Sequence, residues 1–227
     1  MARSQYCVLI LEGNWGEDET TYLTDSRSTS KLYAALEDLL SLGSRPVKFI
    51  QRPLLAGRFA KDVRNFVSLT QDQGRGTVII LSAHGSRRKT KTGKKRRVLQ
   101  ALDGKLNLSL KIKDVADVLG KTILVLDSCE IGERLELFQR VAKALAVIGF
   151  RQDVGWVESA VFILAFLDKL DDHRYFSNEA EIQKAATAAI DAMWSTPYRS
   201  LAEHLGAEKV IGNKIDPVID ENRKTTR

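Results

Sequence analysis

The chain has 227 residues, a length that suits one α/β domain and allows a full hydrophobic core. Hydrophobic residues make up 44% and charged residues 28%, as in ordinary soluble proteins, and no window approaches the roughly 18 to 20 apolar residues of a membrane span. The first apolar run is too short for a signal peptide, and the two cysteines, Cys7 and Cys129, both occupy apolar strand positions. We therefore expect no disulfide framework, no membrane association and a cytoplasmic location.

The net charge of +6 comes from one short stretch. Residues 86–97, SRRKTKTGKKRR, contain eight Lys or Arg and no acid, and removing them from the total leaves a net charge of −2 for the rest. The body is therefore mildly acidic. We expect the basic stretch to form one loop.

Apolar runs alternate with segments of helical periodicity along the first half of the chain. Three runs predict strands, at residues 7–11, 47–53 and 77–83. The first, five apolar residues in succession, is typical of a strand buried on both faces. Between them, helical spacing predicts a helix over residues 30–42 and another around residues 59–67. The apolar positions of the first helix are Leu32, Leu36, Leu39 and Leu40.

The second half continues this alternation. Residues 98–110 predict a β-hairpin that turns at Asp103-Gly104, a pair typical of tight hairpin turns. The expected elements after it are a short helix over 112–119, a strand over 122–128, a helix over 134–144, a strand over 145–150, two helices over 157–170 and 179–194, and a short last strand over 208–213.

Alternating strands and helices predict a mostly parallel sheet with helices on both faces, an α/β fold of three layers. The chain has no internal repeat and no long linker. We therefore expect one domain over residues 1–215, followed by a flexible tail over residues 216–227.

Two strand ends carry the residues of a thiol catalyst. The strand over 77–83 runs into His84-Gly85, and the strand over 122–128 runs into Cys129. Sites in open α/β sheets form at the carboxyl ends of strands, and adjacent strands lie about 4.8 Å apart. A thiolate is a nucleophile, and histidine can take and return its proton. Either residue alone has a structural explanation, packing for the cysteine and a turn for His-Gly. Together they predict a catalytic pair.

A strand ending in His-Gly, followed one core strand later by a strand ending in Asp-x-Cys, resembles the caspase-like cysteine peptidases, which include caspases, metacaspases and CHAT domains. The match covers residues 7–150, and residues 146–170 resemble a small, uncharacterised bacterial branch of that group. The resemblance implies a caspase-like three-layer α/β/α sandwich with a β-hairpin insertion. It also implies a nucleophile at Cys129, a general acid/base at His84, and oxyanion N–H groups at Gly85 and Cys129. It implies no metal and no organic cofactor.

Asp127, two residues before the cysteine, suggests a substrate preference. In the Arg/Lys-cleaving members of this group, an acid at this position forms the floor of the primary specificity pocket. A buried carboxylate prefers a cationic partner, so cleavage after Arg or Lys is the hypothesis. The alternative is that Asp127 only caps the turn after its strand. Further acids that could line the same pocket are Glu12, Asp153 and Glu158.

Three interpretations of the basic stretch stay open: a solvated loop, a phosphate-binding patch, or a segment for self-cleavage or pseudosubstrate binding. Eight cations would attract nucleic acid in a salt-dependent way, but no aromatic residue is interleaved. A basic run beside a site that binds Arg or Lys could enter that site. The candidate residues are Arg87, Arg88, Lys89, Lys94, Lys95, Arg96 and Arg97.

The sequence therefore predicts a cysteine endopeptidase that acts on peptide or protein substrates. One alternative is a nucleic-acid or nucleotide-binding module on a flavodoxin-like sheet. The other is a catalytically inactive caspase-like scaffold. The last strand, over residues 208–213, could pair two copies of the chain into a homodimer.

Overall fold

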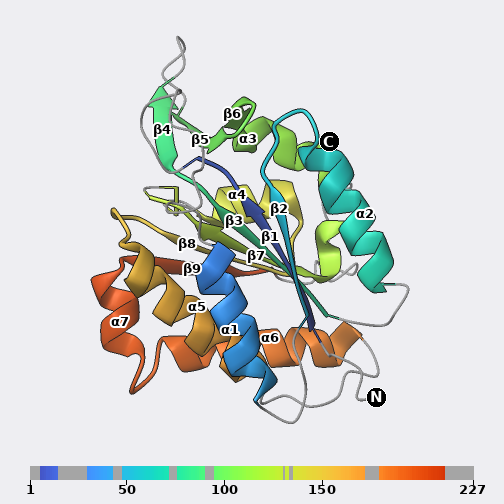
Figure 1. Ribbon diagram of the computed structural model, residues 1–227. Helices are drawn as coiled ribbons and strands as arrows, with labels where there is room; N and C mark the ends of the chain where they lie inside the picture. Colours follow the sequence, from blue (N-terminus) through green and yellow to red (C-terminus); the bar gives the residue numbers. More distant parts are fainter. Residues whose placement is uncertain are drawn as a thin grey trace, which may run out of the picture.

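A computed structural model of the protein describes residues 6–14, 30–42, 48–71, 76–89, 95–129, 131–132, 135–171 and 179–212. Figure 1 shows a central sheet with helices packed on both of its faces. The expected three-layer α/β/α arrangement is confirmed. The expected flexible tail over 216–227 lies outside the described residues.

The central sheet has six strands, and the first five in its spatial order run parallel. Every residue of the strands β1, β3, β7 and β8 is buried, because helices cover both faces of the sheet. The last strand, β9, runs antiparallel at one edge. In spatial order the strands are β2 (Lys48–Pro53), β1 (Tyr6–Glu12), β3 (Gly76–Ser82), β7 (Thr122–Asp127), β8 (Ala146–Phe150) and β9 (Ala207–Ile211).

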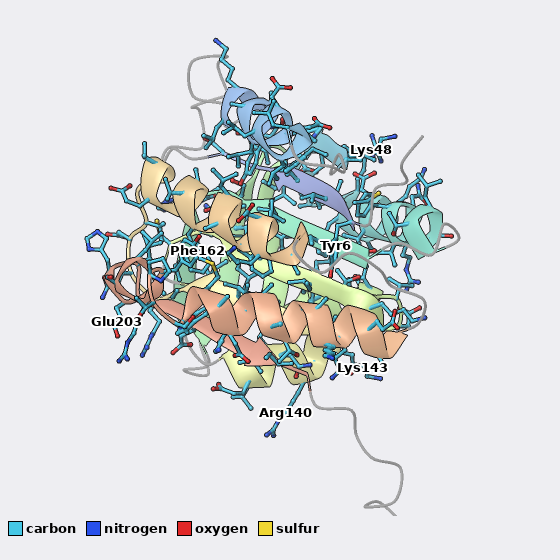
Figure 2. All side chains as sticks on the ribbon, turned by 90° about the horizontal axis from the view of Figure 1, so that it is seen from below. Tyr6, Lys48, Arg140, Lys143, Phe162 and Glu203 are labelled. Atoms are coloured by element: carbon cyan, nitrogen blue, oxygen red, sulfur yellow. The ribbon has the colours of Figure 1, made fainter. Side chains whose placement is uncertain are left out.

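Side chains alternate across the sheet and so build two separate cores. In β1, Val8 and Ile10 join the core on one face, whereas Leu9 and Leu11 join the core on the other. The first core is covered by α1 (Ser30–Ser41), α5 (Trp156–Asp171), α6 (Glu179–Met193) and α7 (Arg199–His204). The second is covered by α2 (Phe59–Gln71), α3 (Leu108–Lys111) and α4 (Leu135–Ala142). Figure 2 views the first face and shows α5 and α6 side by side across it.

The prediction that the basic stretch is a loop was wrong for most of its length. Residues 86–89 belong to the strand β4 (Gly85–Lys89), and residues 95–97 begin the strand β5 (Lys95–Ala101). The two strands are antiparallel, pair in register and project beyond the main sheet (Figure 1). β5 also pairs with β6 (Gly104–Asn107). Leu99 and Leu106 are buried in the second core, so they anchor the small sheet and the basic residues extend from it. Residues 90–94, which include Lys94, lie outside the described residues.

The hairpin between β5 and β6 forms as predicted, with a small shift of its turn. Leu102 and Asp103 make the turn, while Gly104, at φ +129°, already pairs with Ala101. The Asp103 carboxylate accepts main-chain N–H bonds from Ala56 and Gly57 before α2 (2.5 and 3.1 Å). These bonds connect the hairpin turn to the segment before α2.

Three other expectations were only partly right. Residues 108–110 are helical rather than extended, and the helix predicted over 112–119 consists of short 3-10 turns, η1 (Ile112–Val115) and η2 (Leu119–Lys121). Helix α7 was not predicted. In α1 the buried stripe contains Tyr33 (2% exposed), whereas Leu39 is 53% exposed. The aromatic ring, and not the leucine, faces the sheet.

Candidate active site

The predicted catalytic pair, His84 and Cys129, follows the ends of β3 and β7. The two strands are neighbours, and they pair in register up to their last residues, Ser82 and Asp127. Past the sheet, Ala83 N–H donates to the carbonyl of Asp127 (3.3 Å), and the Ser128 hydroxyl donates to the carbonyl of Ala83 (2.5 Å). The two segments therefore stay joined beyond the sheet, and His84 and Cys129 each lie two residues past the end of a paired strand.

The main chain of His84 is held on both sides. Its N–H donates to the carbonyl of Asn14 after β1 (2.8 Å), and its carbonyl accepts from Gln100 N–H in β5 (3.0 Å). Asn14 N–H in turn donates to the carbonyl of Gln100 (2.7 Å). The half-buried histidine therefore leaves β3 on a backbone fixed by two other strands.

The Cys129 thiol lies half-buried beside the segment that follows β8. Val154 N–H donates to its sulfur (3.4 Å). Burial raises the pKa of the Cys129 thiol above its ordinary value, and the charges of Asp153 and Asp127 raise it further. The Val154 N–H acts in the opposite direction because it stabilises the thiolate. In this environment the resting thiol is protonated at neutral pH.

Two of the predicted acids lie in one row at the ends of the central strands, on either side of Ser82. Glu12, Ser82 and Asp127 end three adjacent strands in one register row, and all three are buried (4%, 0% and 3% exposed). The Asp127 carboxylate accepts bonds from the Ser82 hydroxyl (2.8 Å) and from the Tyr33 hydroxyl of α1 (3.0 Å). Glu12 accepts from the side-chain amide of Gln51 (2.7 Å). The row is a buried acidic floor, and we call Glu12 and Asp127 the acid pair.

Burial is the main electrostatic influence on this floor. It raises the pKa of Asp127, and the charge of Glu12 raises it further. The hydroxyls of Ser82, Tyr33 and Ser159 oppose this shift by hydrogen-bonding to the carboxylate. The pKa of Tyr33 is itself raised well above its ordinary value, by burial and by the charge of Asp127. Tyr33 is therefore a neutral donor at every physiological pH.

The other two predicted acids lie elsewhere and are exposed. Asp153 hydrogen-bonds with the Cys129 thiol, so it lies at the reactive sulfur rather than in the acidic floor. Glu158, in the first turn of α5, lies against Gly155, where an added Cβ would collide with its carboxylate. An acid in the first turn stabilises a helix N-terminus. Glu158 therefore has a local structural role.

Gly85 packs directly against the cysteine segment. A Cβ added there would lie 2.6 Å from the carbonyl oxygen of Cys129 and would collide with the Ser128 hydroxyl. Only glycine permits this close approach. The residue after His84 is thus in close contact with the main chain of Cys129.

Within the basic stretch, the arginine next to the core is engaged inside the protein. Arg97 donates through Nε to the carbonyl of Ile131 (2.6 Å), and its guanidinium lies 5.1 Å from the ring centre of Phe138. The backbones of Arg87, Arg88, Lys89, Lys95 and Arg96 belong to β4 and β5.

Sequence reasoning missed three contributors to the site: Tyr33, Val154 and the structural contact of Arg97. Tyr33 lies 94 residues from Asp127 along the chain, and Val154 lies 25 residues from Cys129. A weak signal existed for Tyr33, because it shares helical spacing with Leu36 and Leu40. No local pattern marks the other two.

The described part of the chain contains no group of three or more His, Cys, Asp or Glu residues that could hold a metal ion. Nor does any of its described helices have the length and apolar character of a membrane span.

Comparison with protein-family models and with curated proteins found no match. Among solved structures, the chain is similar to a secreted C11 cysteine protease from Bacteroides thetaiotaomicron, with a TM-score of 0.45 and 11% identity over 86% of this chain. It is also similar to Caspase-1 from Spodoptera frugiperda (TM-score 0.46, 10% identity, 92% of this chain and 87% of the other). A structural-genomics protein from Geobacter sulfurreducens is similar as well (TM-score 0.43, 14% identity, 94% and 96%).

The chain spans 61% of the length of the C11 protease. At these identities the similarity concerns the fold alone. It includes a caspase, the group that the His-Gly and Asp-x-Cys motifs resemble.

Proposed function

We propose that the chain is a cysteine endopeptidase in which Cys129 is the nucleophile and His84 the general acid/base. The observation that carries the proposal is the pairing of β3 with β7 up to their last residues, because His84 and Cys129 each follow one of these strand ends by two residues. The N–H of Val154 at the sulfur supports it, because a donor at that position stabilises the thiolate that forms during attack.

The proposed reaction is acyl transfer. The Cys129 sulfur attacks the scissile carbonyl carbon while His84 accepts the thiol proton. The main-chain N–H groups of Gly85 and Cys129 receive the resulting oxyanion. His84 then protonates the leaving amine, the C–N bond breaks, and a thioester remains. Water, deprotonated by His84, attacks the thioester, releases the carboxylic acid and regenerates the thiol.

The raised pKa of the thiol makes the histidine essential to this scheme. A protonated thiol is a poor nucleophile, so the proton must leave in the same step as the attack. Loss of His84 is therefore expected to remove activity almost as completely as loss of Cys129.

We also propose that cleavage occurs after Arg or Lys. The hydrogen-bond partners of Asp127 include the neutral hydroxyls of Tyr33 and Ser82, so these partners leave its buried charge uncompensated. Glu12, at the end of β1 on the far side of Ser82, adds a second carboxylate to the row. A cationic side chain from a substrate would compensate the charge of Asp127, which favours a basic residue before the cleaved bond. Asp153 can contact a substrate only beside the sulfur, and Glu158 is not part of this pocket.

A panel of fluorogenic peptides tests chemistry and specificity together. Peptides with Arg, Lys, Asp or Leu before the reporter are incubated with the wild type and with Cys129→Ala and His84→Ala. We expect cleavage of the Arg and Lys peptides only, with a loss of at least about 10³-fold in either variant. Cys7→Ala is the matched control, because Cys7 is a buried thiol of β1 (3% exposed). Preference for the Asp peptide would refute the specificity.

Self-processing in the basic stretch is a further part of the proposal. Arg97 is not a cleavage position, because its guanidinium is bonded to Ile131. The remaining candidates are Arg87, Arg88, Lys89, Lys94, Lys95 and Arg96. Incubating the wild type beside Cys129→Ala and sequencing new N-termini tests this. Equal stability of the two chains would exclude self-processing.

The nucleic-acid-binding module and the inactive scaffold predict different outcomes. A thiol-directed electrophile that labels Cys129 and spares Cys7 supports the peptidase. Salt-dependent DNA binding with an unreactive Cys129 would support the module, because phosphate contacts weaken steeply with salt. If Cys129 is not labelled and DNA is not bound, the inactive scaffold is the function that remains.

A further inference from the structure

We propose that Arg97 is a positioning residue that fixes the segment after Cys129 and so couples the basic hairpin to the nucleophile. The inference rests on the proposed peptidase function for its kinetic readout. Its structural part stands on the contacts of Arg97 alone.

Arg97 lies where the basic hairpin enters the core. It pairs with Arg87 in the register of β4 and β5, and the next two residues, Val98 and Leu99, are 7% and 0% exposed. Its own N–H donates to the Ser109 hydroxyl (3.0 Å). The backbone of Arg97 is therefore anchored from both sides of β5.

The side chain of Arg97 makes two contacts that need a guanidinium. Nε–H donates to the carbonyl of Ile131 (2.6 Å), and the charged group lies over the ring of Phe138 in α4, 5.1 Å from its centre. A guanidinium is planar, so one group can bond a carbonyl in its plane and stack on a ring with its face. A lysine ammonium offers a point charge and cannot reproduce both contacts.

The segment held by Arg97 is also fixed from below. Ile131 is fully buried, and Gly132 N–H donates to the carbonyl of Phe150 at the end of β8 (2.8 Å). Gly132 packs so closely that an added Cβ would lie 2.5 Å from the nitrogen of Phe150. The peptide unit between Ile131 and Gly132 is thus held by the hairpin through its carbonyl and by the main sheet through its N–H.

This position matters because Ile131 is only two residues from the nucleophile. In the proposed reaction, the N–H of Cys129 must point at the developing oxyanion. Release of the Ile131 carbonyl lets the peptide planes between these residues rotate. A misplacement of about 1 Å near reacting atoms can cost about 10²-fold in rate. Substrate binding in the acidic floor, on the other face of the sheet, would be unaffected.

The kinetic test compares Arg97→Ala, Arg97→Lys and Arg64→Ala on the Arg-containing peptide. We expect both Arg97 variants to lower kcat about 10- to 100-fold and to leave KM within about threefold, the pattern of a lost transition-state interaction. Added guanidinium ion should restore part of the kcat of Arg97→Ala. Arg64 is the matched control, because it also bonds a main-chain carbonyl, that of Asp114, but between α2 and η1 (2.7 Å). Arg64→Ala is expected to keep wild-type kcat.

A second measurement does not depend on peptidase activity. Amide hydrogen exchange of a peptide covering residues 128–132 should be faster in Arg97→Ala than in the wild type and unchanged in Arg64→Ala. Unchanged exchange in Arg97→Ala would overturn the proposal even if the peptidase is real. Faster exchange would support it even if no peptide is cleaved. If Arg97→Ala does not fold, Arg97→Lys serves for the same measurement.

Discussion

At the scale of single residues, the thiol is controlled by a balance of opposing contacts. Burial and two acids keep Cys129 protonated, whereas the N–H of Val154 favours the thiolate. Of the two acids, Asp153 is exposed and hydrogen-bonds with the thiol, so its charge can be removed without disturbing the core. The Cys129 thiol is therefore expected to be less reactive toward electrophiles than a thiol of ordinary pKa.

Asp153→Asn tests this balance. Removal of the negative charge should lower the pKa of Cys129, so a larger fraction is thiolate at pH 7 and alkylation is faster there, by severalfold. The rate of iodoacetamide modification against pH gives the pKa directly. Glu158→Gln is the control, because that acid lies at Gly155 and not at the sulfur. A pKa that is unchanged or raised in Asp153→Asn would contradict the assignment.

Gly85→Ala tests the close packing beside the nucleophile. The new methyl group would meet the carbonyl of Cys129 and the Ser128 hydroxyl, which lie in the segment directly after β7. The Ser128 hydroxyl is already bonded to the carbonyl of Ala83. Overpacking at such a site costs about 1 to 3 kcal/mol, and displacement of the cysteine should abolish cleavage. Denaturant unfolding and peptide turnover measure the two effects. A variant with wild-type stability and turnover would show that the contact is dispensable.

At the scale of elements, α5 links the cysteine site to the core of one face. Its first turn follows the segment that contacts the Cys129 thiol. On its buried side, the ring of Phe162 packs edge-to-face on the rings of Phe150 and Trp194, with ring centres 5.5 and 5.8 Å away. Phe150 is the last residue of β8, and its carbonyl accepts a hydrogen bond from Gly132 N–H. Packing along α5 therefore stabilises the strand end that supports the cysteine segment.

Phe162→Ala should destabilise the fold by about 3 to 5 kcal/mol, because the ring is fully buried and leaves a cavity. Val157→Ala, on the same helix but 72% exposed, should change stability by less than about 0.5 kcal/mol. Urea unfolding followed by circular dichroism compares the two. Similar losses in both variants would show that α5 is not packed as described.

At the scale of the whole molecule, the buried carboxyl group of Asp127 is a stability cost retained at the proposed site. The folded state raises the pKa of Asp127, so it holds that proton more tightly than the unfolded chain does. The contribution of this group to stability is therefore greatest below the unfolded pKa of about 3.9 and is lost as pH rises through the folded pKa. A substrate cation would compensate this cost only when bound.

Asp127→Asn is accordingly expected to raise the free energy of unfolding at pH 7 and to abolish cleavage after Arg and Lys. Asparagine keeps one oxygen for the hydroxyls of Ser82 and Tyr33 and carries no charge. The gain should grow as pH rises above about 4 and then level off. Urea unfolding at a series of pH values measures it. A variant less stable than the wild type at pH 7 would contradict the electrostatic argument.

The sequence alone determined the fold class and the candidate catalytic residues. Continuous apolar runs predicted the main strands, because a strand buried on both faces is apolar at successive positions. Helical spacing predicted the helices, because a helix buries one face. Chain order placed His84 and Cys129 at the ends of successive core strands, and parallel strands end at one edge. The fold class and the candidate catalytic pair were therefore accessible from local pattern.

Only the tertiary structure decided which polar groups meet. It placed Glu12 and Asp127 in one row with Ser82 between them, whereas Glu158 lies in the first turn of α5. Residue type alone does not distinguish an acid in such a row from an acid at a helix N-terminus. The tertiary structure placed Tyr33, 94 residues away, on Asp127. It also showed that Arg97, expected in a basic loop, donates a hydrogen bond to the carbonyl of Ile131, two residues after Cys129. Such contacts depend on the packing of elements distant in sequence, and no local period records them.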